Sequence, residues 1–177
     1  MRKLIKQGIG KVLVVLVLAV LVVTSFTANA ATTAVVSATV TVTNISVTLD
    51  TDGAVAYGTI GQNSTKDTTT GGEGVNDTES VQNTGNVNEN FTIEGASTAA
   101  WTLTTAAVGS DTYNHSWCTA TCDTTPTWNP FNATPEALAS AIAPAASQTF
   151  DLRINSPNPS TVFTQQTAGV TITASAS

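Results

Sequence analysis

The feature that most constrains the fold of this chain is an alternation of apolar and polar side chains with a period of two. In residues 36–42, 150–154 and 170–174, an apolar residue occupies every second position. Successive side chains of a β-strand point to opposite faces of a sheet, so each segment predicts a strand with one apolar face. Threonine, which suits half-buried pleated surfaces, makes up roughly a fifth of residues 31–177 and supports this interpretation.

Turn signals separate the alternating segments at short intervals. Residues 50–53 (Asp-Thr-Asp-Gly) and 83–86 (Asn-Thr-Gly-Asn) have the composition of tight turns, and 156–160 contains two prolines. Residues 61–76 are polar and glycine-rich, which indicates a long loop or a weak edge strand. We therefore expect an all-β fold for residues 31–177, an antiparallel β-sandwich of about seven or eight short strands, preceded by an N-terminal hydrophobic leader helix.

The first alternating segment changes phase along its length. A slip of one residue sends all following side chains to the other face of a sheet, so we expect a β-bulge or a sheet crossing at Thr43-Asn44. The apolar positions before the slip are Val36, Ala38, Val40 and Val42, and those after it are Ile45, Val47 and Leu49.

One short helix is also expected. Thr134 is a suitable N-cap and Pro135 a suitable first helical residue, and a helix over 136–142 would place Leu138 and Ile142 on one side. Pro144 would end it after at most about two turns.

Two stretches carry a resemblance to a known class of protein. VAYGTIGQNSTKD places an aromatic-Gly-Thr step before a loop, and ESVQNTGNVNENFTI ends one strand in Asn-Thr-Gly-Asn before the next. This layout resembles exported and surface-associated immunoglobulin-like modules, and APAASQTFDLRINSP is similar to their penultimate strand. The resemblance covers most of residues 36–175 and implies an immunoglobulin-like sandwich with a cell-surface role and no catalytic residue. In layout only, the chain is also similar to secreted filament subunits of the TasA and camelysin type.

Residues 1–30 differ in composition from the rest of the chain. A basic start precedes the apolar run VLVVLVLAVLVV, and the small residues Ala28 and Ala30 follow it. This order predicts a secretory signal peptide that is cleaved after Ala30, and hence a secreted protein. Two alternatives remain open: an uncleaved membrane anchor, or a type IV pilin or archaellin-like leader that is cut after Gly8 or Gly10 and retained as a helix.

The charge of the exported part excludes some partners. After residue 30 only Lys66 and Arg153 are basic, whereas all twelve acidic residues remain, which gives a net charge of about −10 (2 − 12). Such a surface has no basic footprint for nucleic acid or anionic lipid. We expect no nucleic-acid partner, and membrane contact only through the leader if it is retained.

Cys118 and Cys122 are the two cysteines of the chain. In an exported protein, two thiols this close are expected to form a disulfide that closes a short loop. The alternative is a zinc site that also uses His115 and Asp123. A disulfide is the favoured interpretation because the compartment is oxidising.

The same region is rich in aromatic side chains, and their exposed faces could stack on a sugar. The favoured interpretation is structural: Trp117 and Trp128 would cover one end of the sandwich where strands are sparse. The candidate ligand surface consists of Tyr113, Trp117, Trp128 and Phe131.

Other chemical motifs are weak. Asp50-x-Asp52-Gly53 is similar to the start of a calcium loop, but three residues without side-chain ligands follow, so a plain hairpin turn is expected. His115 has Ser116 beside it, yet no Gly-x-Ser-x-Gly motif or phosphate-binding glycine loop is present. We expect no enzyme activity, no cofactor and no metal. Six Asn-x-Ser/Thr sequons are compatible with surface exposure.

The sequence thus predicts a non-enzymatic secreted or cell-surface structural protein, a filament or surface-layer subunit that assembles by strand addition to another copy or another surface protein. Its candidate assembly strand is uncharged and so is not protected against pairing with a second chain. For this strand itself, pairing within its own domain is the favoured interpretation, and addition to another copy is the alternative. A binding or adhesion module that recognises glycan or a protein partner through residues 113–131 is the alternative function. The assembly strand is defined by Val36, Ala38, Val40 and Val42.

Overall fold

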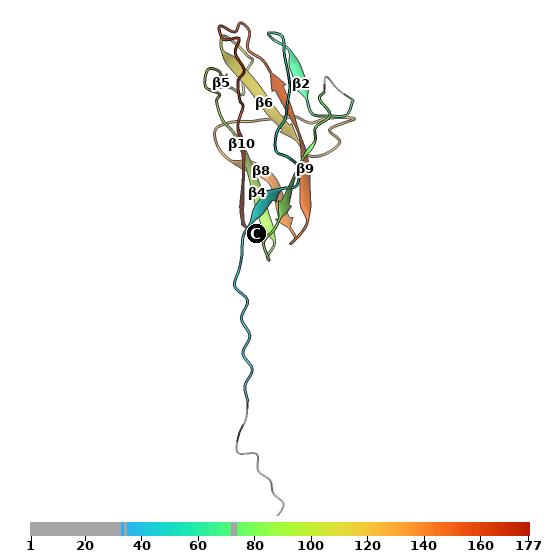
Figure 1. Cartoon of the computed structure of the whole chain (residues 1–177), viewed down its shortest axis with the longest axis vertical. Helices are drawn as coiled ribbons and strands as arrows, with labels where there is room; N and C mark the ends of the chain where they lie inside the picture. The colour runs from blue at the N-terminus through green and yellow to red at the C-terminus, as the bar shows by residue number, and fades with distance from the viewer. Residues whose placement is uncertain (1–32, 34, 72–73) are drawn as a thin grey trace, which may run out of the picture. The chain divides into compact units, whose positions relative to one another are not determined.

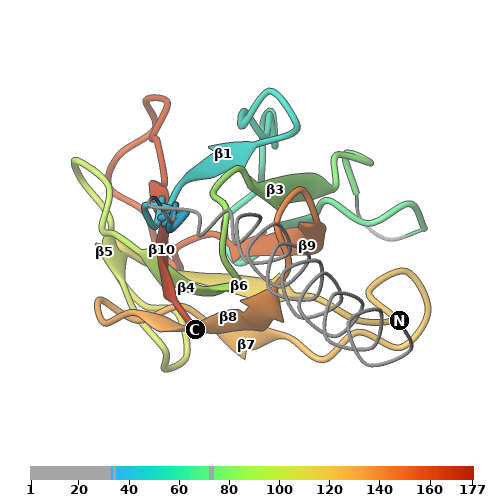
Figure 2. The same ribbon diagram turned by 90° about the horizontal axis from the view of Figure 1, so that it is seen from below.

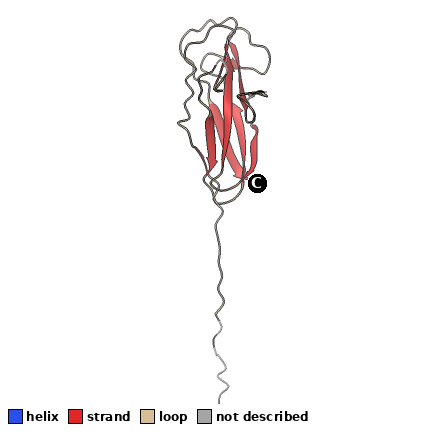
Figure 3. Ribbon diagram, turned by 90° about the vertical axis from the view of Figure 1, so that its right-hand side faces the viewer, coloured by secondary structure: helices blue, strands red, loops and turns tan. Residues whose placement is uncertain are grey.

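A computed structural model describes residues 33, 35–71 and 74–177 of the chain. Residues 42–177 form one compact unit, and the residues up to Thr41 belong to a second one. The predicted leader, with its cleavage signature at Ala28 and Ala30, lies outside the described residues. The described part consists of strands and loops (Figure 3), and it contains no helix that is long and apolar enough to span a membrane.

The larger of two sheets brings together strands from both ends of the chain (Figure 1). Its pairs are antiparallel except for β5 and β6, which run parallel, so the expectation of a purely antiparallel fold is wrong at this edge. The main order is β1 (Val47–Leu49), β3 (Glu79–Asn83), β9 (Ser147–Asn155), β6 (Thr112–Cys118) and β5 (Thr102–Leu103), with β2 (Thr65–Asp67) paired to β9 and β7 (Asn129–Pro130) paired to β6.

The smaller sheet has three antiparallel strands. Its order is β10 (Val170–Ala176), β4 (Glu89–Gly95) and β8 (Glu136–Ile142). Figure 2 shows these three strands as one group and β1, β3 and β9 as another. The described residues therefore hold ten strands, several of them only two or three residues long.

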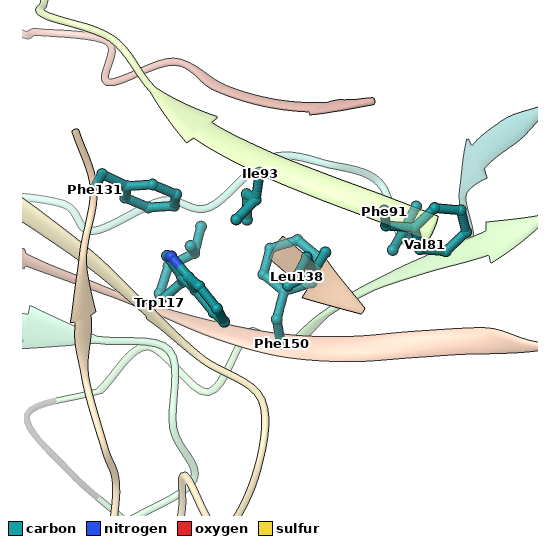
Figure 4. Packing of buried hydrophobic residues seen from close by; sticks show 8 residues of the cluster. Val81, Phe91, Ile93, Trp117, Phe131, Leu138 and Phe150 are labelled. Atoms are coloured by element: carbon teal, nitrogen blue, oxygen red, sulfur yellow. The ribbon is translucent and has the colours of Figure 1, made fainter. Parts of the chain in front are cut away.

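The core lies between the two sheets, which makes the fold a β-sandwich. Figure 4 shows side chains of the small sheet pointing towards those of the large sheet. Each large apolar side chain removed from water in this way contributes about 1.5–3 kcal/mol of transfer free energy. The core residues are Phe91, Ile93 and Leu138 from the small sheet, Val81, Trp117, Phe150 and Leu152 from the large sheet, and Phe131 from the loop between β7 and β8.

The helix expected over 136–142 is not formed. These residues make strand β8, which pairs with β4 and places Leu138 in the core. A helix of two turns has almost no stability by itself, whereas the edge of β4 offers a ladder of backbone hydrogen bonds. Tertiary pairing thus overrides the local capping signals.

The strand expected over 36–42 is also not formed within the described residues. Residues 35–46 belong to no strand, and β1 begins only at Val47. The expected bulge at Thr43-Asn44 is therefore not observed. The valines at positions 35, 36, 40 and 42 have 80–94% of their surface exposed.

Candidate assembly site

The predicted disulfide is present between Cys118 and Cys122, with their Cα atoms 5.9 Å apart. It joins the end of β6 to the following loop, and both cysteines are buried. Because both sulfur atoms are used in this bond, they do not serve as zinc ligands together with His115 and Asp123.

The predicted aromatic surface is mostly interior. Tyr113, Trp117 and Phe131 are buried, so these three rings do not form an exposed face for a sugar. Trp128 is half-buried, and the guanidinium carbon of Arg153 lies 4.7 Å from the centre of its ring. Tyr113 and Trp117 are buried because they lie on β6, whose residues from His115 to Cys118 are all buried.

His115 lies inside an aromatic cluster. It is 1% exposed, its Nε2 is 3.1 Å from the Tyr57 hydroxyl, and the ring of Phe131 is 5.1 Å away between centroids. Burial lowers the pKa of His115 to about 4, so the imidazole is neutral at physiological pH. Burial also raises the pKa of Tyr57, and the Asp67 carboxylate raises it further. His115 is thus a neutral, buried group that is held by Tyr57 and Phe131 within the domain.

The turn between β3 and β4 holds the chain that leads into β1. The Asn86 amide group donates to the Val42 carbonyl at 2.8 Å, and its oxygen accepts from the Asn44 backbone N–H at 2.8 Å. The Asn86 backbone N–H donates to the Asn44 carbonyl at 3.1 Å. One asparagine therefore fixes both backbone groups of this segment, as a neighbouring strand would.

A second set of contacts continues this arrangement towards β1. Thr84 donates its backbone N–H to the Ser46 carbonyl at 2.8 Å, and the Ser46 backbone N–H donates to Glu89 Oε1 at 2.9 Å. Glu89 is fully buried. We call residues 83–89, together with residues 42–46 that they bind, the N-terminal clamp.

Asn83 organises the clamp from within. Its side-chain oxygen accepts from the Gly85 backbone N–H at 2.8 Å, and its amide group donates to the carbonyls of Val87 and Ile142, each at 2.8 Å. The Asn-Thr-Gly-Asn turn was visible in the sequence. The sequence does not show that this turn binds residues 42–46 or that Glu89 accepts a hydrogen bond from Ser46. Both contacts depend on which distant segment packs against the turn.

Replacing Gly85 by alanine is expected to loosen the clamp. A Cβ at this position would lie 2.3 Å from Glu89 Oε1 and 2.4 Å from the Asn44 carbonyl oxygen. Because one of these atoms belongs to the backbone, the segment would have to shift, at a cost of about 2 kcal/mol in unfolding free energy. Urea unfolding measures the loss, and Gly169→Ala is the control, since a Cβ there meets nothing within 4 Å. Equal stability of the two variants would contradict the tight contact.

The outer edge of β10 is the least protected long edge of the described domain. β10 pairs with β4 alone, in regular register over Val170–Ala176, and all seven residues are uncharged. The opposite edge strand β8 contains Glu136, has two register shifts against β4, and has a positive φ at Ala141. Charges and bulges protect an edge against pairing with another chain, and β10 lacks both.

The fold and these contacts define the class: an all-β sandwich with a disulfide and an exposed apolar N-terminal segment. Comparison of the chain with protein-family models, curated proteins and solved structures yields no match.

Proposed function

We propose that the protein is an exported, non-enzymatic structural subunit of a cell-surface filament or layer, which assembles when residues 36–42 of one copy add as a strand to another copy. The observation that carries this proposal is the exposed alternating segment whose last residue, Val42, is also the first residue of the clamp. Its three valines, at positions 36, 40 and 42, are 80–91% exposed, and it has no partner strand within the described residues. Apolar side chains in such numbers mark an interaction surface.

The acceptor in this proposal is the outer edge of β10 in a second copy. Donor and acceptor each comprise seven uncharged residues, 36–42 and Val170–Ala176. The inward side chains of β10 (Val170, Ile172 and Ala174) pack against the core, so an added strand would extend the apolar face with its own alternate valines. The donor and acceptor are two separate segments of the chain, so their pairing is head-to-tail, which permits an open chain of subunits rather than a closed pair.

The clamp supports this role because it fixes the point at which the donor segment joins the domain. Asn86 holds Val42 and Asn44 by hydrogen bonds, so a mechanical force on the donor segment would act on the β3–β4 turn as well as on β1. The two-layer arrangement is consistent with an immunoglobulin-like sandwich, in which the first strand commonly changes sheets. The disulfide and the predicted signal peptide favour an exported, surface-associated protein.

The binding-module alternative has less support, because three of its four candidate rings are buried. The pilin or archaellin-like alternative depends on residues outside the described part. The N-terminal residue of the protein recovered from cells distinguishes the three possible fates of the leader. Ala31 indicates signal-peptide cleavage, Met1 an uncleaved anchor, and residue 9 or 11 pilin-type processing.

A synthetic peptide with the sequence of residues 35–43 is expected to prevent assembly when it is in excess. It would occupy the edge of β10, and hydrogen exchange should show new protection of amides in Val170–Ala176 but not in Glu136–Ile142. The matched control is a peptide of the same composition with its valines placed side by side, which removes the alternation. Inhibition by both peptides, or by neither, would show that strand addition at β10 is not how subunits associate.

A further inference from the structure

Three carboxylates converge beside β1 and β3. One carboxylate oxygen from each of Asp52, Asp77 and Glu79 lies within 4.8 Å of the other two. Asp52 is exposed, Asp77 is half-buried and Glu79 is buried, so the group extends from the surface to the interior. In the sequence, Asp50 and Asp52 are similar to the start of a calcium loop, but the remaining ligands of such a loop are missing.

The register of β1 and β3 explains why these residues meet. Leu49 pairs with Val81, and beyond this pair the Asp50 N–H donates to the Ser80 carbonyl at 2.9 Å. The same antiparallel continuation places Thr51 opposite Glu79, where the Thr51 hydroxyl donates to Glu79 Oε2. Asp52 therefore follows directly beside the residues that lead into β3. The missing ligands come from the neighbouring strand, not from the same loop.

Glu79 is the independent sign of a bound cation. Its side chain is 3% exposed, and its second oxygen, Oε1, has no hydrogen-bond partner. A buried carboxylate is costly unless it is paired with a positive charge, and two further acidic groups beside it increase the cost.

Among the described residues, the basic side chains make their contacts elsewhere. After residue 30 the chain has two basic residues, Lys66 and Arg153. The Lys66 ammonium donates to the Tyr57 carbonyl at 2.7 Å, and the Arg153 guanidinium lies over Trp128. The single histidine is buried and neutral, with its pKa lowered by burial.

We propose that Asp52, Asp77 and Glu79 bind a calcium ion. All three ligands are oxygen atoms, which excludes a preference for zinc, since zinc favours nitrogen and sulfur. Calcium takes six to eight oxygen ligands in flexible geometry, whereas magnesium is bound through one or two carboxylates. The Thr51 hydroxyl, which donates to Glu79 Oε2, lies beside Glu79, and solvent water would complete the shell on the exposed side of Asp52. The ion joins the β1–β2 connection to β3.

The test uses the protein as the cell processes it, stripped with EDTA and titrated with calcium chloride. Calorimetry is expected to show one calcium ion bound per chain. Thermal unfolding is expected to move upward by about 5–10 °C at a calcium concentration 100 times the Kd, because the ion binds the folded state alone. No heat of binding and no shift in Tm would overturn the proposal, and so would a larger shift with magnesium chloride than with calcium chloride.

Two ligand variants and one control make the test specific. Glu79→Gln and Asp52→Asn are each expected to weaken calcium binding by at least about tenfold. Without calcium, Glu79→Gln should melt no lower than the stripped wild type, because it removes a buried charge. Asp50→Asn is the matched control: Asp50 Oδ2 accepts from the hydroxyls of Ser80 and Ser147, outside the cluster, and calcium binding should be unchanged. Wild-type affinity in both ligand variants would refute the site, and none of these results depends on assembly.

Discussion

A chain that lacks residues 31–42 is expected to remain folded and to lose assembly completely. All ten described strands begin after Val42, and every member of the buried core lies beyond it. The deletion removes one hydrogen bond of the clamp, from the Asn86 amide to the Val42 carbonyl, which is worth about 0.5–1.5 kcal/mol. Light scattering should report a monomer, while circular dichroism keeps the β spectrum of the parent.

A point variant gives a stricter form of the same test. Val40→Asp introduces a charge in the middle of the donor segment, and a buried or edge-paired charge opposes strand addition. The control is Phe163→Asp, because Phe163 is 80% exposed and apolar but lies in the loop before β10. We expect Val40→Asp to abolish filaments or oligomers and Phe163→Asp to preserve them. Assembly that survives both the deletion and Val40→Asp would mean that the subunits meet through another surface.

Part of the fold could be predicted because its signal is local. Phe150, Leu152 and Ile154 alternate in the sequence and are buried together on β9, and β10 follows the same rule. The Asn-Thr-Gly-Asn turn between β3 and β4 is predictable for the same reason, since turn chemistry depends on a few adjacent residues. These predictions need no knowledge of what lies across the sheet.

Other parts depend on distant partners and could not be predicted. Glu136–Ile142 has caps that suit a helix, but the open edge of β4 decides its conformation. Conversely, the segment 36–42 has the pattern of a strand but no partner strand in the described chain. An alternation of apolar and polar residues predicts which face of a strand is apolar. It does not predict which segment, or which copy of the chain, supplies the neighbouring strand.

The candidate sites show the same limit. The sequence offers Tyr113 and Trp117 as ligand-binding rings because residues 113–131 have the pattern of a loop, whereas Thr112–Cys118 is strand β6, on which both rings are buried. Glu89 and Glu79 gave no signal, since an isolated glutamate in a sequence is normally solvated. Only the register of β1 against β3 and the β3–β4 turn reveal that both carboxylates are buried.

Acidification from pH 7 to pH 4 is expected to remove about 3 kcal/mol of unfolding free energy through His115. Burial lowers its pKa from the usual 6.5 to about 4 in the folded protein. Between these values the unfolded chain binds a proton that the folded chain does not, so stability is full above about pH 6.5 and is lost as the pH falls. The difference in pKa (6.5 − 4 = 2.5) corresponds to about 3 kcal/mol at 1.36 kcal/mol per pKa unit. The Tyr57 hydroxyl and the rings of Tyr113 and Phe131 surround the imidazole and provide no charge that would hold the proton.

Because carboxylates also titrate in this range, the contribution of His115 is obtained as a difference. The unfolding free energy of a variant without the imidazole is subtracted from that of wild type at each pH. Urea unfolding of wild type and His115→Gln should be compared at intervals from pH 7.5 to pH 4. Glutamine retains a hydrogen-bonding group near Tyr57 but has no titrating proton, and His115→Phe repeats the measurement with a ring of similar shape. Both variants are expected to be less stable than wild type at pH 7.5, and this deficit should shrink by about 3 kcal/mol as the pH reaches 4. Parallel profiles would mean that the imidazole is protonated in the folded state at its ordinary pKa, and hence that solvent or a carboxylate reaches the aromatic cluster.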